Sequence, residues 1–139
     1  MFFFSSKPVR LANSGGSILE GRVEIYHDNA WGTVCDNRWG MQDADVVCKQ
    51  IGFQSAFKAT GAAAFGEGTG SPILLDDVQC TGQEEGLREC YHRGWGQHVC
   101  EHSQDAGVIC DEGKCNRRRQ LLQNYIKGIL RSNSLPVGW

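Results

Sequence analysis

Cysteine and histidine are the side chains in this sequence that could ligate a metal or carry out nucleophilic chemistry. Seven cysteines stand at positions 35, 48, 80, 90, 100, 110 and 115, and their spacing contains no C-x-x-C pair of the zinc-ribbon or thioredoxin type. His98, Cys100 and His102 would share one face of a strand, but no fourth zinc ligand stands at an obvious spacing. We therefore expect the cysteines to form disulfides, as they do in small domains of oxidising compartments.

A hydrolase triad and a phosphate-binding loop are both suggested by residue type and both disfavoured by spacing. His102, Ser103 and Asp105 lie within four residues, where a nucleophile and its base cannot usually be oriented from separate elements. The Gly-rich segment 65–70 is followed neither by a Lys-Ser/Thr pair nor by the start of a helix. The sequence also lacks a nucleophile elbow and a metalloprotease helix. These patterns predict a protein that is not an enzyme.

Composition and charge divide the chain into three regions. Its 139 residues, 40% of them hydrophobic, suffice for one domain, with an extension at 1–7, a body at 8–112 and a tail at 113–139. Residues 1–112 hold eight basic and all sixteen acidic side chains, whereas 113–139 hold six basic side chains and no acidic one. An acidic body argues against nucleic-acid binding, which needs clustered Lys and Arg. We expect neither a signal peptide nor a transmembrane span in this chain, because its apolar runs are too short.

Hydrophobic periodicity predicts the strands and the helix that carry these residues. Polar and apolar residues alternate over 21–26, a turn follows at 27–29, and 30–35 returns as a second strand, which together indicate a hairpin. Residues 42–51 have helical spacing, with acidic residues in the first turn and Gly52 as the C-cap. Further elements are expected as an extended start at 8–11, a buried strand at 73–75, a helical turn at 83–90 and a closing strand at 106–110.

Several segments resemble the scavenger receptor cysteine-rich (SRCR) domain, and its group A, six-cysteine type in particular. They are Gly-Arg-Val-Glu-Ile at 21–25, Trp-Gly-Thr-Val-Cys-Asp at 31–36, and the stretches 45–53, 65–70, 75–82 and 105–110, in the family's order. The resemblance implies an α+β fold in which a small, disulfide-stapled, curved antiparallel sheet cradles one helix. It also implies the bridges Cys35–Cys100, Cys48–Cys110 and Cys80–Cys90. Cys115 is left over, and it could bridge to another chain, remain free or pair with a segment outside this sequence.

The family resemblance also carries expectations about function. It implies a non-catalytic, scavenger-receptor-like recognition module that binds protein or anionic surface ligands. We therefore expect an extracellular protein or the ectodomain of a membrane protein. Because such domains are also appended to enzymes, the alternative is an accessory fragment of a larger extracellular enzyme such as a protease or a lysyl-oxidase-like protein. A dimer could form through Cys115 or through the tail.

Calcium is the one cofactor that the resemblance suggests, because many relatives bind Ca²⁺ through two groups of acidic residues. The first group is represented here by Asp36, Asn37 and Gln104, in which amides replace two of the family's carboxylates. The second group keeps Asp76 and Asp77, but a valine stands where the family often has an asparagine. Since carboxylate charge strengthens calcium binding, we expect a weakened site. The alternative is that the aspartates only accept hydrogen bonds from turn amides.

The expected ligand-binding residues are Arg22, Glu24, Trp31 and Arg38. The segment that contains the first three is similar to one that contacts bacterial or polyanionic surfaces in some relatives. The alternative is that this segment is strand core, with Val23, Ile25 and Trp31 buried. Arg22, Arg38 and Arg93 could form a basic spot, although an acidic body weakens any affinity for polyanions.

The basic tail has the pattern of an amphipathic helix. Asn116 could cap a helix that runs to about Arg131 and carries its apolar residues on one face. Such a helix fits a partner or a membrane surface, or could dock on the acidic body or on a second copy of the chain. The run 117–119 of three arginines is also a potential proteolytic target. A frayed or non-native extension is the alternative.

Overall fold

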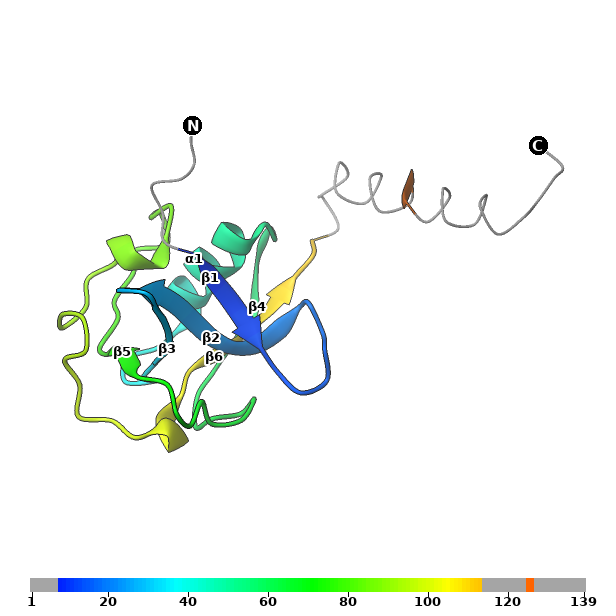
Figure 1. The fold of residues 1–139 in the computed structure, drawn as a ribbon. Helices are drawn as coiled ribbons and strands as arrows, with labels where there is room; N and C mark the ends of the chain where they lie inside the picture. Colours follow the sequence, from blue (N-terminus) through cyan, green and yellow to red (C-terminus); the bar gives the residue numbers. More distant parts are fainter. Residues whose placement is uncertain (1–7, 114–124, 127–139) are drawn as a thin grey trace, which may run out of the picture.

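The body folds into one curved sheet of six strands against which a single α-helix packs (Figure 1). The structure is a computed structural model that describes residues 8–113 together with 125 and 126. The strands are β1 (Val9–Ala12), β2 (Glu20–His27), β3 (Ala30–Val34), β4 (Ser55–Thr60), β5 (Ile73–Leu75) and β6 (Gly107–Asp111). The helix is α1 (Met41–Ile51), and two short 3₁₀ segments are η1 (Leu87–Glu89) and η2 (His102–Gln104).

The predicted hairpin is confirmed as β2 and β3. Tyr26 pairs with Trp31 and Glu24 with Thr33 in antiparallel register. The turn places Asp28 at φ 54° and Asn29 at φ 67°, left-handed values that these two residue types tolerate better than most. Period-two alternation then directs one set of β2 side chains into the core and the other set to the outer face of the sheet.

The sheet order is β4-β6-β2-β3-β5, and β1 pairs with β2. All pairings are antiparallel except that of β3 with β5, which is parallel. A parallel pair needs a long crossover connection, and here α1 and β4 lie in the chain between the two strands. The implied curved antiparallel sheet with one helix is therefore confirmed, with one parallel pair as an addition.

Helix α1 begins one residue before the predicted start and ends at the predicted residue. The Asp43 carboxylate accepts the backbone N–H of Gly40 at 2.8 Å, which satisfies a donor at the N-terminus. Gly52 ends the helix at φ 117°, a conformation that favours glycine. The buried face of the helix carries Cys48 into the core beside Val23 and Ile25 of the sheet.

Strand β4 and the two 3₁₀ segments differ from the sequence prediction, which did not include η2. Strand β4 was not anticipated, and it contains a bulge between Ala56 and Lys58 that leaves Phe57 67% exposed. The bulge interrupts the alternation by which a strand is recognised in a sequence. The helical turn expected at 83–90 is shorter, because only Leu87–Glu89 adopts 3₁₀ geometry.

Three disulfides join the described part of the chain: Cys35–Cys100, Cys48–Cys110 and Cys80–Cys90. These are the pairs that the resemblance implies. The first closes a separation of 65 residues at the end of β3, and the second joins α1 to β6.

Cys115 and nearly all of the predicted tail helix lie outside the described residues. Tyr125 and Ile126 are helical and exposed. Within the part of the chain that is described, no helix has the length and apolar character of a membrane span.

Candidate functional site

A buried glutamate lies between two arginines on the outer face of the sheet. Alternation in β2 places Arg22 and Glu24 on the face opposite Val23 and Ile25, which are fully buried. Glu24 is only 5% exposed, and its Oε1 accepts a hydrogen bond from Arg10 Nε at 2.8 Å. Its Oε2 accepts from Arg22 Nη2 at 3.0 Å and from Nε at 3.1 Å. The carboxylate is thus compensated from two strands, as a buried charge requires.

Trp31 belongs to the same outer face. Its ring meets the Tyr26 ring edge to face, with centroids 5.3 Å apart. The Arg10 guanidinium lies 4.1 Å from the centre of the Trp31 ring, in a cation–π contact. Arg10 therefore links Glu24 to Trp31, and we name Arg10, Arg22, Glu24 and Trp31 the outer-sheet cluster.

The outer-sheet cluster contains three of the four residues expected to bind a ligand. Trp31 is half-buried and does not join the core, whereas Val23 and Ile25 do. Sequence reasoning did not single out Arg10, although its position between two apolar residues already indicated the outer face. The fourth expected residue, Arg38, lies elsewhere and pairs with Asp77.

The Gly-rich segment 65–70 is held as part of the scaffold. Arg22 Nη1 donates to the Gly66 carbonyl at 3.1 Å, and the Gly68 N–H donates to Asp105 Oδ2 at 2.8 Å. Asp105 is fully buried, so this bond lies inside the protein. These contacts tie the segment to β2 and to the buried Asp105.

His102 has partners on both ring nitrogens. Nδ1 lies 2.9 Å from Asp105 Oδ2, and Nε2 lies 2.8 Å from the Ser71 carbonyl. Neither nitrogen is left to act as a base toward Ser103. His98 Nδ1 accepts the backbone N–H of Cys100, whose sulfur is in a disulfide. The alternating His-Cys-His pattern therefore serves local structure.

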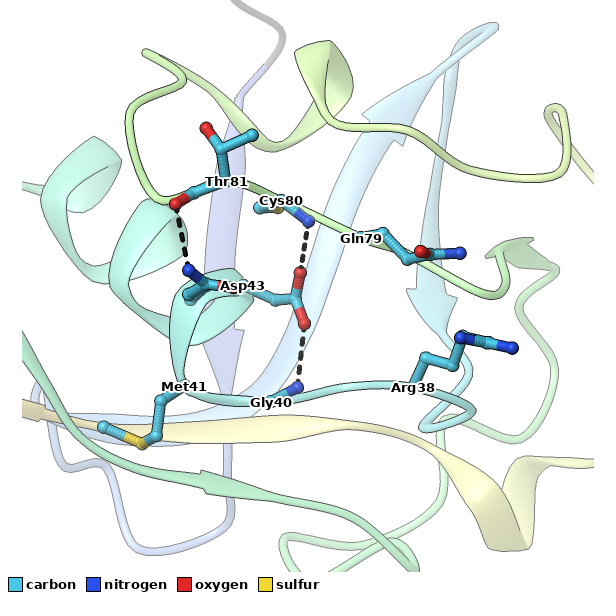
Figure 2. Close-up of a pocket in the computed structure, with 8 residues that line it drawn as sticks. Arg38, Gly40, Met41, Asp43, Gln79, Cys80 and Thr81 are labelled. Carbon is cyan, nitrogen blue, oxygen red and sulfur yellow. Dashed lines mark hydrogen bonds between the residues drawn. The ribbon is translucent and has the colours of Figure 1, made fainter.

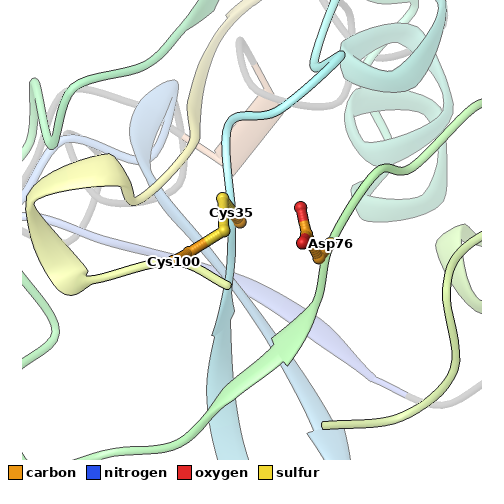
Figure 3. A group of neighbouring side chains, drawn as sticks. All are labelled: Cys35, Asp76 and Cys100. Atoms are coloured by element: carbon orange, nitrogen blue, oxygen red, sulfur yellow. A yellow bond between two sulfur atoms is a disulfide. The ribbon is translucent and has the colours of Figure 1, made fainter. Parts of the chain in front are cut away.

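Asp76 is a fully buried carboxylate beside the Cys35–Cys100 disulfide (Figure 3). A carboxylate oxygen of Asp76 and the two sulfurs lie within 4.8 Å of one another. A thiolate is the form of cysteine that binds metal, so these oxidised sulfurs do not make a metal site. Asn37 Nδ2 donates to Asp76 Oδ1 at 3.2 Å, and Arg93 Nη1 lies 3.4 Å from Oδ2.

Asp77 is paired with the second arginine near this position. Arg38 Nε lies 2.9 Å from Asp77 Oδ1, and Gln79 Nε2 lies 3.5 Å from the same oxygen. Arg38 and Arg93 thus flank two consecutive aspartates, while Arg22 pairs with Glu24. The three arginines of the suggested basic spot each have an acidic partner.

The residues of the first expected calcium group are engaged locally. Asp36 Oδ2 accepts the Ala62 N–H at 2.7 Å, and Gln104 Oε1 accepts the Glu101 N–H at 3.2 Å. A backbone hydrogen bond of 2.8 Å from Asp36 to Gln104 brings these two residues together. Across the described residues, the groups of three His, Cys, Asp or Glu ligand atoms within 4.8 Å all include a disulfide. Calcium binding by these residues stays a prediction.

A surface hollow of about 770 Å³ opens between the start of α1 and the Cys80 segment, and Arg38 lies on its rim (Figure 2). Asp43 is buried in its wall, where Oδ1 accepts the Cys80 N–H at 2.7 Å. Burial raises the pKa of Asp43, against the opposing effect of the N–H donors of Cys80 and Gly40. Sequence reasoning assigned Asp43 only a place in the first turn of the helix.

Three aromatic rings, one of which contacts the other two, join the hairpin to the loop that follows Cys90. The His27 ring stacks on the Trp95 ring at a centroid distance of 3.7 Å, and His92 meets Trp95 edge to face at 5.2 Å. Burial, together with repulsion from His27, lowers the pKa of His92. The spacing of these residues in the sequence gave no sign of this contact.

The family model of the scavenger receptor cysteine-rich domain matches residues 13–111. The chain belongs to the SRCR family. An SRCR superfamily protein of Patiria pectinifera is 57% identical over 97 residues, which are 70% of this chain and 8% of that protein. Galectin-3-binding proteins of Pongo abelii and Bos taurus are 54% and 55% identical over 102 residues, 73% of this chain and 17% and 18% of theirs. The chain therefore spans less than a fifth of these curated relatives.

Solved SRCR domains share the fold. The third SRCR domain of murine neurotrypsin superposes with a TM-score of 0.69 at 47% identity, covering 76% of this chain and 97% of that domain. The dimeric form of the SRCR domain of mouse MARCO gives a TM-score of 0.61 at 40% identity, covering 66% and 86%. These SRCR relatives support a receptor-like, extracellular recognition module.

Proposed function

We propose that residues 8–112 form a group A SRCR domain that acts as a non-catalytic extracellular recognition module and binds a protein ligand. The observation that carries this proposal is the outer-sheet cluster, in which Glu24 fixes two arginines and Arg10 covers an indole ring. Arginine and tryptophan held rigidly on a sheet are the residue types that dominate protein interfaces. A preorganised cluster loses little side-chain entropy when a partner binds.

A protein ligand is favoured over a polyanion by the charges of the body. Of the five arginines between residues 8 and 112, four lie in ion pairs with Glu24, Asp76 or Asp77. Acidic side chains also outnumber basic ones in this region. A polyanion would have to displace these internal carboxylates, whereas a protein can complement both signs of charge.

The absence of catalysis in this proposal is supported by the partners of His102. Its two ring nitrogens face Asp105 and the Ser71 carbonyl, so the histidine acts as a structural link. An extracellular location is supported by three disulfides in a domain of this size, because such bridges persist in oxidising compartments.

The alternative function is that of an accessory domain in a larger extracellular enzyme, such as a protease or a lysyl-oxidase-like protein. It agrees with the finding that the chain spans less than a fifth of its curated relatives, which are therefore much longer proteins. The reading frame before Met1 and after Trp139 distinguishes the two proposals, because only the alternative requires a catalytic domain there.

Self-association is a further part of the proposal. The solved SRCR domain of mouse MARCO is described in a dimeric form, and this chain offers Cys115 and the basic tail for contacts between copies. Sedimentation of the full chain, of Cys115→Ser and of a chain ending at residue 113 tests this. A dimer lost in both variants indicates a disulfide through Cys115, and a dimer lost only on truncation indicates the tail.

Surface plasmon resonance on the immobilised full chain tests the ligand class. Galectin-3 serves as the protein probe, since the relatives are named for binding it, and dextran sulfate serves as the polyanion probe. We expect Trp31→Ala and Arg10→Ala to weaken protein binding about tenfold or more, as interface anchors do. Phe57→Ala removes an exposed aromatic side chain from β4, outside the outer-sheet cluster, and should leave binding unchanged.

Two results would contradict the proposal. Tight binding of dextran sulfate with none of galectin-3 would favour a polyanion ligand. Equal binding of galectin-3 by the native chain and both cluster variants would place the contact surface elsewhere.

A further inference from the structure

Two consecutive aspartates after β5 carry negative charge that the fold has to compensate. Asp76 is fully buried, and the side chain of Asp77 is 27% exposed. An ionised carboxylate in a protein interior is costly unless a cation or strong hydrogen-bond donors face it. The family resemblance implies that calcium supplies this positive charge in many relatives, so the partners in this chain decide whether an ion fits.

Arg93 supplies the charge that faces Asp76. Its Nη1 lies 3.4 Å from Asp76 Oδ2, and its own backbone N–H donates to the Asp76 carbonyl at 3.2 Å. The loop that carries Arg93 runs beside the β5 segment, since Gln79 pairs with Tyr91 in an isolated bridge. The backbone therefore holds Arg93 next to the buried carboxylate.

Arg38 supplies the charge that faces Asp77. Its Nε lies 2.9 Å from Asp77 Oδ1. Both residues adopt left-handed backbone conformations, with φ at 62° for Arg38 and 57° for Asp77. Such conformations are uncommon outside glycine and persist where surrounding structure imposes them. The two turns thus direct the side chains of Arg38 and Asp77 toward each other.

The donor set left around the aspartates does not fit calcium, which takes six to eight oxygen ligands. Asn37 presents its amide nitrogen to Asp76 Oδ1 at 3.2 Å, and that group is a donor. In the described ranges no group of three neighbouring ligand atoms joins Asp76 to a second carboxylate, and the group at Asp76 is completed by the two sulfurs of a disulfide. Two aspartates and two arginines also leave no net charge to attract a divalent ion.

We infer that Arg38 and Arg93 replace the bound cation of calcium-dependent relatives, so that this face keeps its shape and its ligand affinity without calcium. The guanidinium groups neutralise the same aspartates from inside the chain. This inference rests on the proposed function only in treating the face as one used for recognition. A titration with the ion alone tests it separately, so its failure would leave the recognition proposal in place.

Calorimetric titration of CaCl₂ into the native chain and into the double variant Arg38→Ala/Arg93→Ala tests the inference. We expect no calcium heat and no change in thermal midpoint for the native chain. The double variant should bind calcium at least about tenfold more tightly than the native chain, because calcium affinity follows the charge of the site. Lys49→Ala/Lys58→Ala is the matched control, since it removes the same charge from two exposed positions.

A second variant distinguishes the effect of the two arginines on calcium binding from the effect of having an amide at Asn37 in place of a carboxylate. Asn37→Asp adds an acid beside Asp76 while both arginines remain. If Asn37→Asp alone binds calcium as tightly as the double arginine variant, the lost carboxylate explains the difference and the inference fails. It also fails if the native chain binds calcium as tightly as the double variant, or if neither binds.

The test remains decisive if the double variant unfolds. Refolding by calcium and not by magnesium would support the inference, and failure of calcium to restore the fold would oppose it. Arg38→Ala alone keeps Arg93 beside the buried Asp76, and the Arg38 side chain is 68% exposed, so this variant should fold. It should show a smaller calcium-induced rise in thermal midpoint than the double variant, and no rise would count against the inference.

Discussion

The Asp43 carboxylate accepts the backbone N–H of Cys80, 37 residues further along the chain, at 2.7 Å. Its second oxygen accepts the N–H of Gly40 at the start of α1 (Figure 2). One buried side chain therefore caps the start of a helix and holds the segment that carries Cys80 of the Cys80–Cys90 bridge. These two hydrogen bonds compensate the burial of the Asp43 carboxylate, which is only 4% exposed.

Replacing Asp43 by asparagine should destabilise the domain. The amide keeps the shape of the side chain but presents one NH₂ group to a backbone donor, which leaves a buried N–H unpaired. We expect a loss of about 1–3 kcal/mol in the free energy of unfolding, measured by chemical denaturation. Asp28→Asn in the exposed hairpin turn is the control and should change stability by less than about 0.5 kcal/mol. Equal losses in the two variants would contradict the role of the buried bonds.

Acidification should destabilise the fold through His92. Its pKa is lowered by burial and by His27, so the folded state binds the proton less tightly than the unfolded state does. The stability that neutral His92 contributes to the fold is fully present above the ordinary pKa of 6.5. It is lost as the pH falls through the lowered pKa. Denaturation from about pH 7.5 to about pH 5 should show this decline, and His92→Gln should flatten it. A decline that is unchanged in His92→Gln would exclude this histidine as its source.

Asp43 should give a pH dependence of opposite sign at lower pH. Its pKa is raised above 3.8 by burial, so the folded state binds the proton more tightly than the unfolded chain does. This contribution to stability is complete below 3.8 and is lost as the pH rises through the raised value. In Asp43→Asn, stability measured in the acid range should therefore lack the loss that this carboxyl gives the native chain as the pH rises from 3.8 through the raised value. The same slope in both proteins would contradict the raised pKa.

Local patterns in the sequence predicted the elements whose evidence is itself local. The alternation of Val23 and Ile25 with charged residues fixes which face of β2 is buried, and it also fixes β3 through a two-residue turn. The helical spacing that ends at Gly52 predicted α1 to within one residue. Strand β4 escaped prediction because its bulge at Phe57 breaks the alternation.

The candidate site was only partly predictable because its contacts are long-range. Alternation places Arg10 and Glu24 on an outer face, but only the register between β1 and β2 makes them neighbours. The pairing of Arg93 with Asp76 depends on a loop that returns beside β5. Neither relationship has a periodic signal in the sequence, since each is set by how distant segments pack.

Removing disulfides should cost stability in the order of the loops they close. Loop entropy gives about 4 kcal/mol for Cys35–Cys100, which spans 65 residues, and about 3 kcal/mol for Cys80–Cys90, which spans 10. Paired Cys→Ala variants, compared by guanidinium denaturation, measure both values. If the shorter bridge costs clearly more, its anchoring of the Cys80 segment outweighs the effect of loop length.

Neutralising Glu24 should weaken the outer-sheet cluster and the fold together. Glu24→Gln keeps the side-chain volume but leaves Arg22, whose side chain is 16% exposed, without a charged partner. We expect a loss of about 2 kcal/mol in the free energy of unfolding, because an unpaired buried charge is costly. Glu67→Gln at an exposed position of the Gly-rich segment is the control and should have little effect.

Double-mutant cycles divide this loss between the two arginines. The coupling of Glu24 with Arg22 should exceed that with Arg10, because Arg22 contacts the carboxylate through two nitrogens and is less exposed than Arg10, at 16% against 52%. Unfolding of Glu24→Gln, Arg22→Ala, Arg10→Ala and the two double variants supplies the values. A stronger coupling to Arg10 would mean that its contact with Trp31, and not burial, governs the strength of the cluster.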